Sequence, residues 1–134
     1  MPLIFPNKLE VLMVHERLLA ETGGLSGLRD EALFESALSA AESRHFYEAA
    51  DAVSCAASYA YHLTQAHAFV DGNKRLGAAI AETFLETNGF ELAMSNEEIV
   101  NLFLAIASSQ LSRTQVEEKF RERVIPKTQT IQHD

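Results

Sequence analysis

The nine residues His67-Ala68-Phe69-Val70-Asp71-Gly72-Asn73-Lys74-Arg75 place turn-forming and charged side chains directly before a segment with helical spacing. In that segment, apolar residues recur at intervals of three and four, at Leu76, Ala79, Ile80, Phe84 and Leu85. This period predicts a helix that begins within residues 72–74 and ends at residues 88–89. The first N–H groups of a helix have no partner within it and lie at the positive end of its dipole. The stretch therefore predicts an anion-binding loop at a helix start.

Each polar residue of this loop has a chemical use. Gly72 lets the backbone approach an anion closely, and Lys74 and Arg75 add positive charge. Asp71 offers the kind of oxygen ligand that Mg²⁺ prefers when it also binds nucleotide phosphates. Histidine is the side chain most often used to move a proton at neutral pH, so His67 could take a proton from an attacking hydroxyl.

Simpler interpretations compete with these. Asp71 could cap the following helix with no metal present, and Asn73 could do no more than stabilise the turn. His67 could be an ordinary histidine at a helix end. Lys74 and Arg75 could form a solvated helix start, although cations are disfavoured at the positive end of the dipole, which favours an anion there.

The rest of the chain also follows helical periodicity and predicts an all-α, single-domain, six-helix bundle. Helices are expected over residues 6–21, from residue 31 after the N-cap Asp30, and over residues 51–65. Two capping boxes, at residues 95–98 and 112–115, predict the starts of the last two helices. A short extended piece is expected over residues 90–94. We expect a folded domain over residues 1–125 and a disordered polar tail over residues 126–134.

Bulk properties exclude several classes of protein. The chain has 134 residues, enough for one domain, and a formal net charge of −8, which argues against nucleic-acid binding. It shows no signal peptide and no apolar run of membrane-spanning length. Cys55 is the single cysteine, which suits a reducing cytoplasm, and we expect it to be a buried apolar residue. The other histidines, His15, His45, His62 and His133, lack metal-ligand spacing.

The stretch at residues 67–75 resembles the signature of the Fic family, His-x-Phe-x-Asp/Glu-Gly-Asn-x-Arg. Its Asn-Lys-Arg ending is more similar to the death-on-curing (Doc) branch than to typical Fic enzymes, which have Asn-Gly-Arg. The segment Gly23-Gly24-Leu25-Ser26-Gly27-Leu28-Arg29-Asp30, continuing into residues 35–38, is similar to an N-terminal stretch of Doc-like proteins. The resemblance extends to about Arg123.

The resemblance implies a role for each motif residue. It makes His67 the general base for a target Ser or Thr hydroxyl and Asp71 the contact for Mg²⁺. Gly72, Asn73, Lys74 and Arg75 would bind the phosphates of ATP, and Phe69 would anchor the loop. Two departures from the Fic signature, Lys74 in place of Gly and Ala78 in place of a second Arg, match the Doc branch.

The Doc branch implies a cytoplasmic toxin of a toxin–antitoxin system. Its expected activity is transfer of the γ-phosphoryl group of ATP to a translation elongation factor. Two alternatives remain: a protein adenylyltransferase of the same fold, and a catalytically degenerate module that binds nucleotide and an antitoxin.

The resemblance leads to two further expectations. The segment over residues 42–50, with Phe46 and Tyr47, could be the flap that positions the target, or it could be ordinary loop packing. The string nearest to a self-inhibitory Fic helix is Thr114-Gln115-Val116-Glu117-Glu118-Lys119, which ends in Lys rather than Gly or Asn. We therefore expect an antitoxin acting in trans, with part of it folded into a groove of the bundle.

Overall fold

The computed structural model describes residues 2–127, which form six helices and two short strands. The helices are α1 (Lys8–Thr22), α2 (Glu31–Glu48), α3 (Ala52–Gln65), α4 (Asn73–Thr87), α5 (Asn96–Ala107) and α6 (Arg113–Arg123). The strands are β1 (Phe90–Leu92) and β2 (Val124–Pro126). The prediction of an all-α, six-helix bundle is confirmed. No helix within residues 2–127 is long and apolar enough to cross a membrane.

Most helices begin where the sequence places a capping residue. The Asp30 side chain accepts a hydrogen bond from the Leu33 N–H, and Ser95 and Ser112 each form the predicted capping box. The first helix begins two residues later than we expected. Asn7 is its N-cap, and Asn7 and Glu10 form a reciprocal capping box that fixes the start at Lys8.

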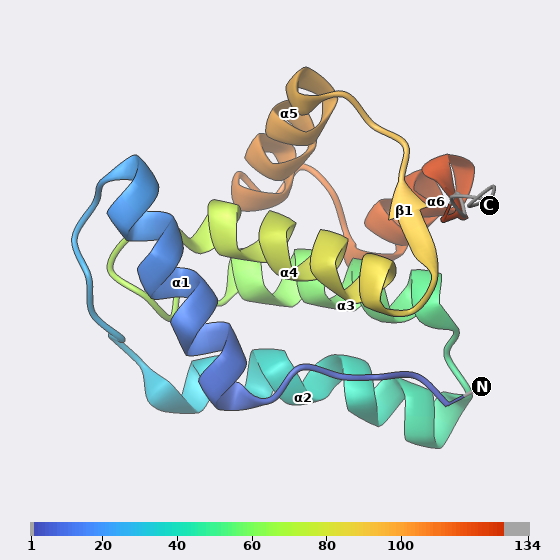
Figure 1. Cartoon of the computed structure of the whole chain (residues 1–134), viewed down its shortest axis with the longest axis horizontal. Helices are drawn as coiled ribbons and strands as arrows, with labels where there is room; N and C mark the ends of the chain where they lie inside the picture. The colour runs from blue at the N-terminus through green and yellow to red at the C-terminus, as the bar shows by residue number, and fades with distance from the viewer. Residues whose placement is uncertain (1, 128–134) are drawn as a thin grey trace, which may run out of the picture.

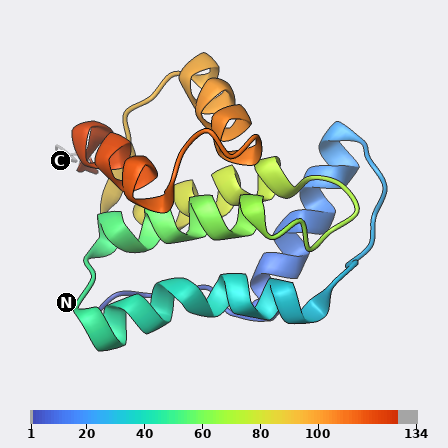
Figure 2. The ribbon, with the colours of Figure 1, turned by 180° about the vertical axis from the view of Figure 1, so that it is seen from behind.

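The helices α3 and α4 run side by side through the middle of the molecule, with α2 on one side and α5 and α6 on the other (Figure 1). Ten of the 14 residues of α3 are buried, and many of them are alanines that permit close packing. On α4, a Cβ at Gly77 would collide with the Thr64 hydroxyl of α3. The loop of residues 66–72 joins these two central helices at one end of the bundle, beside α1 (Figure 2).

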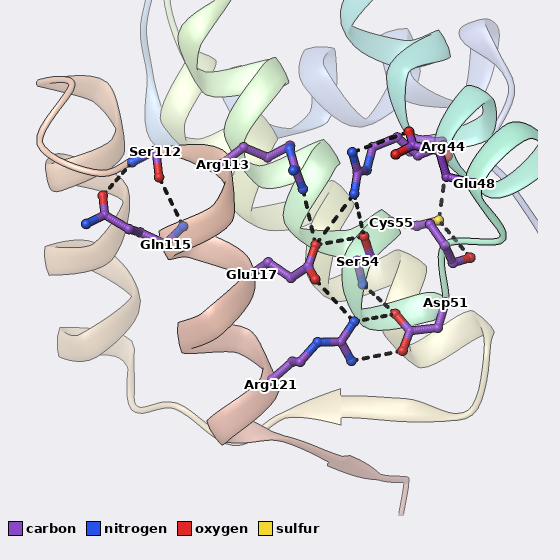
Figure 3. Close-up of polar contacts among 12 residues, drawn as sticks. Arg44, Glu48, Asp51, Ser54, Cys55, Ser112, Arg113, Gln115, Glu117 and Arg121 are labelled. Atoms are coloured by element: carbon purple, nitrogen blue, oxygen red, sulfur yellow. Dashed lines mark hydrogen bonds and ion pairs between the residues drawn. The ribbon is translucent and has the colours of Figure 1, made fainter.

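Charged side chains hold α6 against the start of α3 (Figure 3). Arg121 donates two hydrogen bonds to the Asp51 carboxylate, at 2.9 and 3.0 Å, and holds the pKa of that carboxyl below its usual range. The Ser54 hydroxyl donates to Glu117 at 2.7 Å. Beneath this network Cys55 is fully buried, as expected, and burial raises the pKa of its thiol to about 11.

The two strands pair antiparallel, with Phe90 opposite Pro126. The sequence predicts the extended piece at residue 90 but not its partner, because three residues ending in proline show no alternating pattern. The Lys127 N–H also donates to the Gly89 carbonyl at 2.9 Å. Residues 126 and 127 are therefore ordered against β1, two residues past the expected end of the domain. The rest of the expected tail, residues 128–134, lies outside the described residues.

Candidate active site

The loop between α3 and α4 is held along its backbone by the segment that precedes α2. The Ala68 carbonyl accepts hydrogen bonds from the N–H groups of Arg29 and Asp30, at 2.7 and 3.0 Å. The Val70 N–H donates to the Gly27 carbonyl at 3.1 Å. Residues 27–30 thus lie alongside residues 68–70 in a short antiparallel arrangement, which fixes the path of the loop.

Phe69 anchors the loop in the core. Its side chain is 3% exposed and packs edge-on against Phe34, with ring centroids 5.1 Å apart. The Asn73 side chain clamps the Phe69 backbone, since its amide donates to the Phe69 carbonyl at 3.0 Å and its oxygen accepts from the Phe69 N–H at 3.2 Å. The turn-stabilising interpretation of Asn73 therefore holds for its side chain, which leaves the backbone N–H of Asn73 for an anion.

The start of α4 is uncapped. Gly72 is the N-cap, with φ of +82°, and no side chain within residues 2–127 caps it. The Asp71 carboxylate instead accepts a hydrogen bond from the Leu25 N–H at 2.8 Å. The interpretation of Asp71 as a helix cap is therefore wrong. The first N–H groups of α4 keep their capacity to bind an anion.

The charged residues lie around this helix start. Lys74 is exposed, while Arg75 is half-buried and donates to the Thr22 hydroxyl and, at 3.1 Å, to the Gly23 carbonyl. His67 is exposed and has a left-handed backbone, with φ of +47°. Its carbonyl accepts a hydrogen bond from the Arg29 side chain at 2.7 Å, which holds this unusual conformation.

One cavity of about 220 Å³ brings the sequence-predicted residues together. His67, Asp71, Gly72, Asn73, Lys74 and Arg75 all line it, with Thr64, Val70 and Ala107 completing the wall. The sequence does not indicate that Thr64 and Ala107 line this cavity, because they come from α3 and α5 and only the fold places them there.

The cavity lining suits a magnesium ion that also binds substrate phosphates better than it suits a metal ion held by protein side chains alone. Asp71 is the one carboxylate among the residues that line the cavity. Within the part of the chain that the structure describes, no group of three His, Cys, Asp or Glu side chains could hold a metal ion. Mg²⁺ often takes one carboxylate and completes its coordination with water and substrate phosphates, so the residues present fit that arrangement.

The sequence model of the Fic/DOC family matches residues 6–85, from the start of α1 to the end of the apolar face of α4. The chain belongs to the Fic/DOC family. It is also similar to "Protein kinase doc" of Escherichia phage P1, with 27% identity over 113 residues, which cover 84% of this chain and 89% of that protein. The family match contains both the cavity loop and the segment of residues 23–30 that pairs with it.

Residues 42–50, for which the sequence left open a flap or ordinary loop packing, do not lie beside the loop in this Fic/DOC chain. Residues 42–48 continue α2, and Phe46 and Tyr47 are 72% and 88% exposed near its C-terminal end. The other end of α2 contacts the loop, through its N-cap residue Asp30 and through Phe34, which packs on Phe69. Phe46 follows Asp30 by 16 residues, which at 1.5 Å per residue places it roughly 24 Å away. The segment that lies beside the loop is residues 23–30.

Proposed function

We propose that this chain is a toxin that acts as an ATP- and Mg²⁺-dependent protein kinase. It transfers the γ-phosphoryl group of ATP to a Ser or Thr of a translation elongation factor and so halts protein synthesis in the cytoplasm. The observation that carries the proposal is the uncapped start of α4, which opens into a cavity shared by His67, Lys74 and Arg75. The similarity to the phage P1 protein kinase supports the same reaction.

Binding of the triphosphate follows from the charges and donors at this helix start. The N–H groups of Asn73, Lys74 and Arg75 are the first three of α4, and the side chains of Lys74 and Arg75 reinforce the positive end of its dipole. Gly72 has no side chain, and a Cβ there would face His15 and Leu19 of α1, so the glycine lets α1 pack closely against the loop beside the anion site. Asp71 would hold a magnesium ion that neutralises charge on the phosphates.

His67 performs the proton transfer. The oxygen of the target hydroxyl attacks the γ-phosphorus of ATP while the His67 imidazole takes the hydroxyl proton. The bond between the γ-phosphorus and the oxygen that bridges the β- and γ-phosphates breaks, and ADP leaves with that oxygen. The exposed position of His67 at the cavity lets a hydroxyl from another protein reach it.

Adenylyl transfer is the alternative reaction for this fold, and Lys74 favours phosphoryl transfer over it. The Lys74 side chain occupies space that a glycine would leave open, and it adds a charge that can hold a phosphate. Ala78 offers no second guanidinium one turn further along α4. Because transfer needs in-line geometry, a shift of the triphosphate changes which phosphorus faces the hydroxyl.

ATP labelled at either phosphorus separates the possibilities. Purified protein, a bacterial elongation factor and Mg²⁺ are incubated with γ-labelled or α-labelled ATP. We expect the γ-label on the elongation factor, and we expect Lys74→Gly to lose most of this transfer. Transfer of the α-label would show adenylylation instead. Transfer of neither label, with ATP still bound, would show the degenerate module.

We further propose that an antitoxin inhibits the protein in trans. A cavity of about 500 Å³ lies between α1, α4 and α5, and Lys74 and Arg75 at one end connect it with the active site. Apolar side chains dominate its walls, and burial there raises the pKa of Glu82. An amphipathic antitoxin segment with a basic residue would suit this groove.

Inhibition within the chain is not favoured by the position of α6. Glu118 is exposed, and the neighbouring Glu117 bonds Ser54 near the start of α3. The active-site loop follows the other end of α3, 11 residues or roughly 16 Å further along that helix. We therefore expect Glu118→Gly to leave the activity of the isolated protein unchanged. A large rise in activity would show inhibition in cis.

A further inference from the structure

His15 lies on α1, far in sequence from the active-site loop, yet it contacts the centre of that loop. The side chain is 3% exposed, and its Nε2 lies 2.8 Å from the backbone carbonyl oxygen of Asp71. Because the partner is a carbonyl, Nε2 carries the proton and donates the bond. The imidazole also stacks on the Phe69 ring, with centroids 3.8 Å apart and an angle of 25° between the planes.

The same ring lies under Gly72. A Cβ built on Gly72 would sit 3.3 Å from His15 Nε2, which is closer than ordinary van der Waals contact. His15 therefore contacts three parts of the loop: the buried Phe69 ring, the Asp71 carbonyl and Gly72, which occupies the N-cap position of α4. None of these contacts involves the imidazole of His67.

The hydrogen bond to Asp71 has a consequence for the anion site. In a trans peptide the carbonyl and the following N–H point in opposite directions. The His15 bond holds the Asp71 carbonyl toward α1, so the Gly72 N–H must point away from α1. The Gly72 N–H immediately precedes the free N–H groups of α4, and its direction decides whether it can join them around a phosphate.

We propose that His15 is a positioning residue for the active site. It orients the Asp71–Gly72 peptide and thereby sets both the anion-binding N–H groups and the Asp71 carboxylate in their working positions. This inference rests on the proposed function for its effect on catalysis, but its effect on the loop can be measured separately.

The test compares two substitutions that differ in the hydrogen bond. His15→Phe keeps an aromatic ring for the stack on Phe69 and removes the donor, whereas His15→Gln keeps an N–H of similar reach. A matched control is His45→Phe, because His45 Nδ1 donates to the Ala50 carbonyl at 2.8 Å near the end of α2 that lies away from the loop. Each protein is examined for kcat and KM with ATP and the elongation factor, and for amide hydrogen exchange over residues 68–76.

We expect His15→Phe to lower kcat by roughly 10- to 100-fold, since small displacements of reacting groups have effects of this size. KM for the protein target should change little, and the loop amides should exchange faster. His15→Gln should keep most of the wild-type kcat. His45→Phe should match the wild type in kcat and in the exchange of the loop amides. If the wild type transfers no phosphoryl group, the proposed function fails, and the exchange data alone still decide whether His15 positions the loop.

Three results would overturn the inference: wild-type kcat and loop exchange in His15→Phe, no difference between the Phe and Gln variants, or an equal loss of kcat in His45→Phe. Should His15→Phe fail to fold, His15→Asn replaces it. The shorter Asn side chain cannot bring its N–H to the Asp71 carbonyl, so equal activity of the Asn and Gln variants would also overturn the inference.

Discussion

The substitution Gly72→Ala tests whether α1 packs so closely against the active-site loop that a side chain at position 72 destabilises the protein. Gly72 has φ of +82°, a region that L side chains avoid at a cost of about 1–2 kcal/mol. The added Cβ would also lie 3.3 Å from both His15 Nε2 and Leu19 Cδ2, so the loop or α1 must shift by a few tenths of an ångström. Crowding of this kind in a packed interior costs about 1–3 kcal/mol. We expect the free energy of unfolding to fall by about 2–5 kcal/mol in total.

Gly89→Ala is the matched control. Gly89 has φ of +90°, and a Cβ there would meet no described atom within 4 Å. It therefore bears the conformational cost of about 1–2 kcal/mol without the crowding. The effect of replacing glycine by alanine on the unfolded chain is common to both variants and cancels in the comparison.

Urea unfolding followed by circular dichroism measures both variants. With a urea dependence of about 1–3 kcal/mol per molar, Gly72→Ala should unfold at a distinctly lower urea concentration than Gly89→Ala. Only Gly72→Ala should lose phosphoryl transfer, because only this substitution displaces the anion site. Equal destabilisation of the two variants would refute the argument that His15 and Leu19 leave no room beside Gly72.

Three further predictions concern the base, the anion site and an ion pair. His67→Ala should lower phosphoryl transfer by about 10²–10⁴-fold and abolish growth arrest in cells while the protein stays folded; growth arrest by a well-expressed variant would exclude the assigned role. Crystals grown with phosphate or sulfate should hold the anion near Asn73, Lys74 and Arg75, and anions bound only elsewhere would argue against the site. Hydrogen bonds from Arg123 lower the pKa of Glu98 from 4.5 to about 2, so this carboxylate stabilises the fold above pH 4.5, and the contribution is lost as the pH falls toward 2. Glu98→Gln should reduce the acid sensitivity of unfolding over this range, and an unchanged pH dependence would contradict the ion pair.

Local signals in the sequence were enough to predict six helices and most of their starts, although the start of α1 and the full length of α2 were missed. The capping boxes at Ser95 and Ser112 were found because both partners lie within four residues of each other. The composition of residues 67–75 likewise located the cavity loop and its helix start. These features depend on chemistry between neighbours in the chain, which a single sequence contains.

Features that depend on distant contacts could not be predicted in this way. His15 shows no special spacing, and its contact with the loop follows only from the packing of α1 under Asp71, 56 residues further along the chain. The family resemblance left open a flap at residues 42–50, but α2 continues to Glu48 and carries Phe46 and Tyr47 away from the site. The strand β2 has three residues and exists because β1 is adjacent to it.

The most direct test of the central claim is the intact mass of the elongation factor after incubation with this protein, ATP and Mg²⁺. We predict a gain of one phosphoryl group with the wild-type protein and no gain with His67→Ala. Digestion should then locate the modification on a Ser or Thr. A gain of an adenylyl group, or an equal phosphoryl gain with His67→Ala, would contradict the account of a kinase that uses His67 as its base.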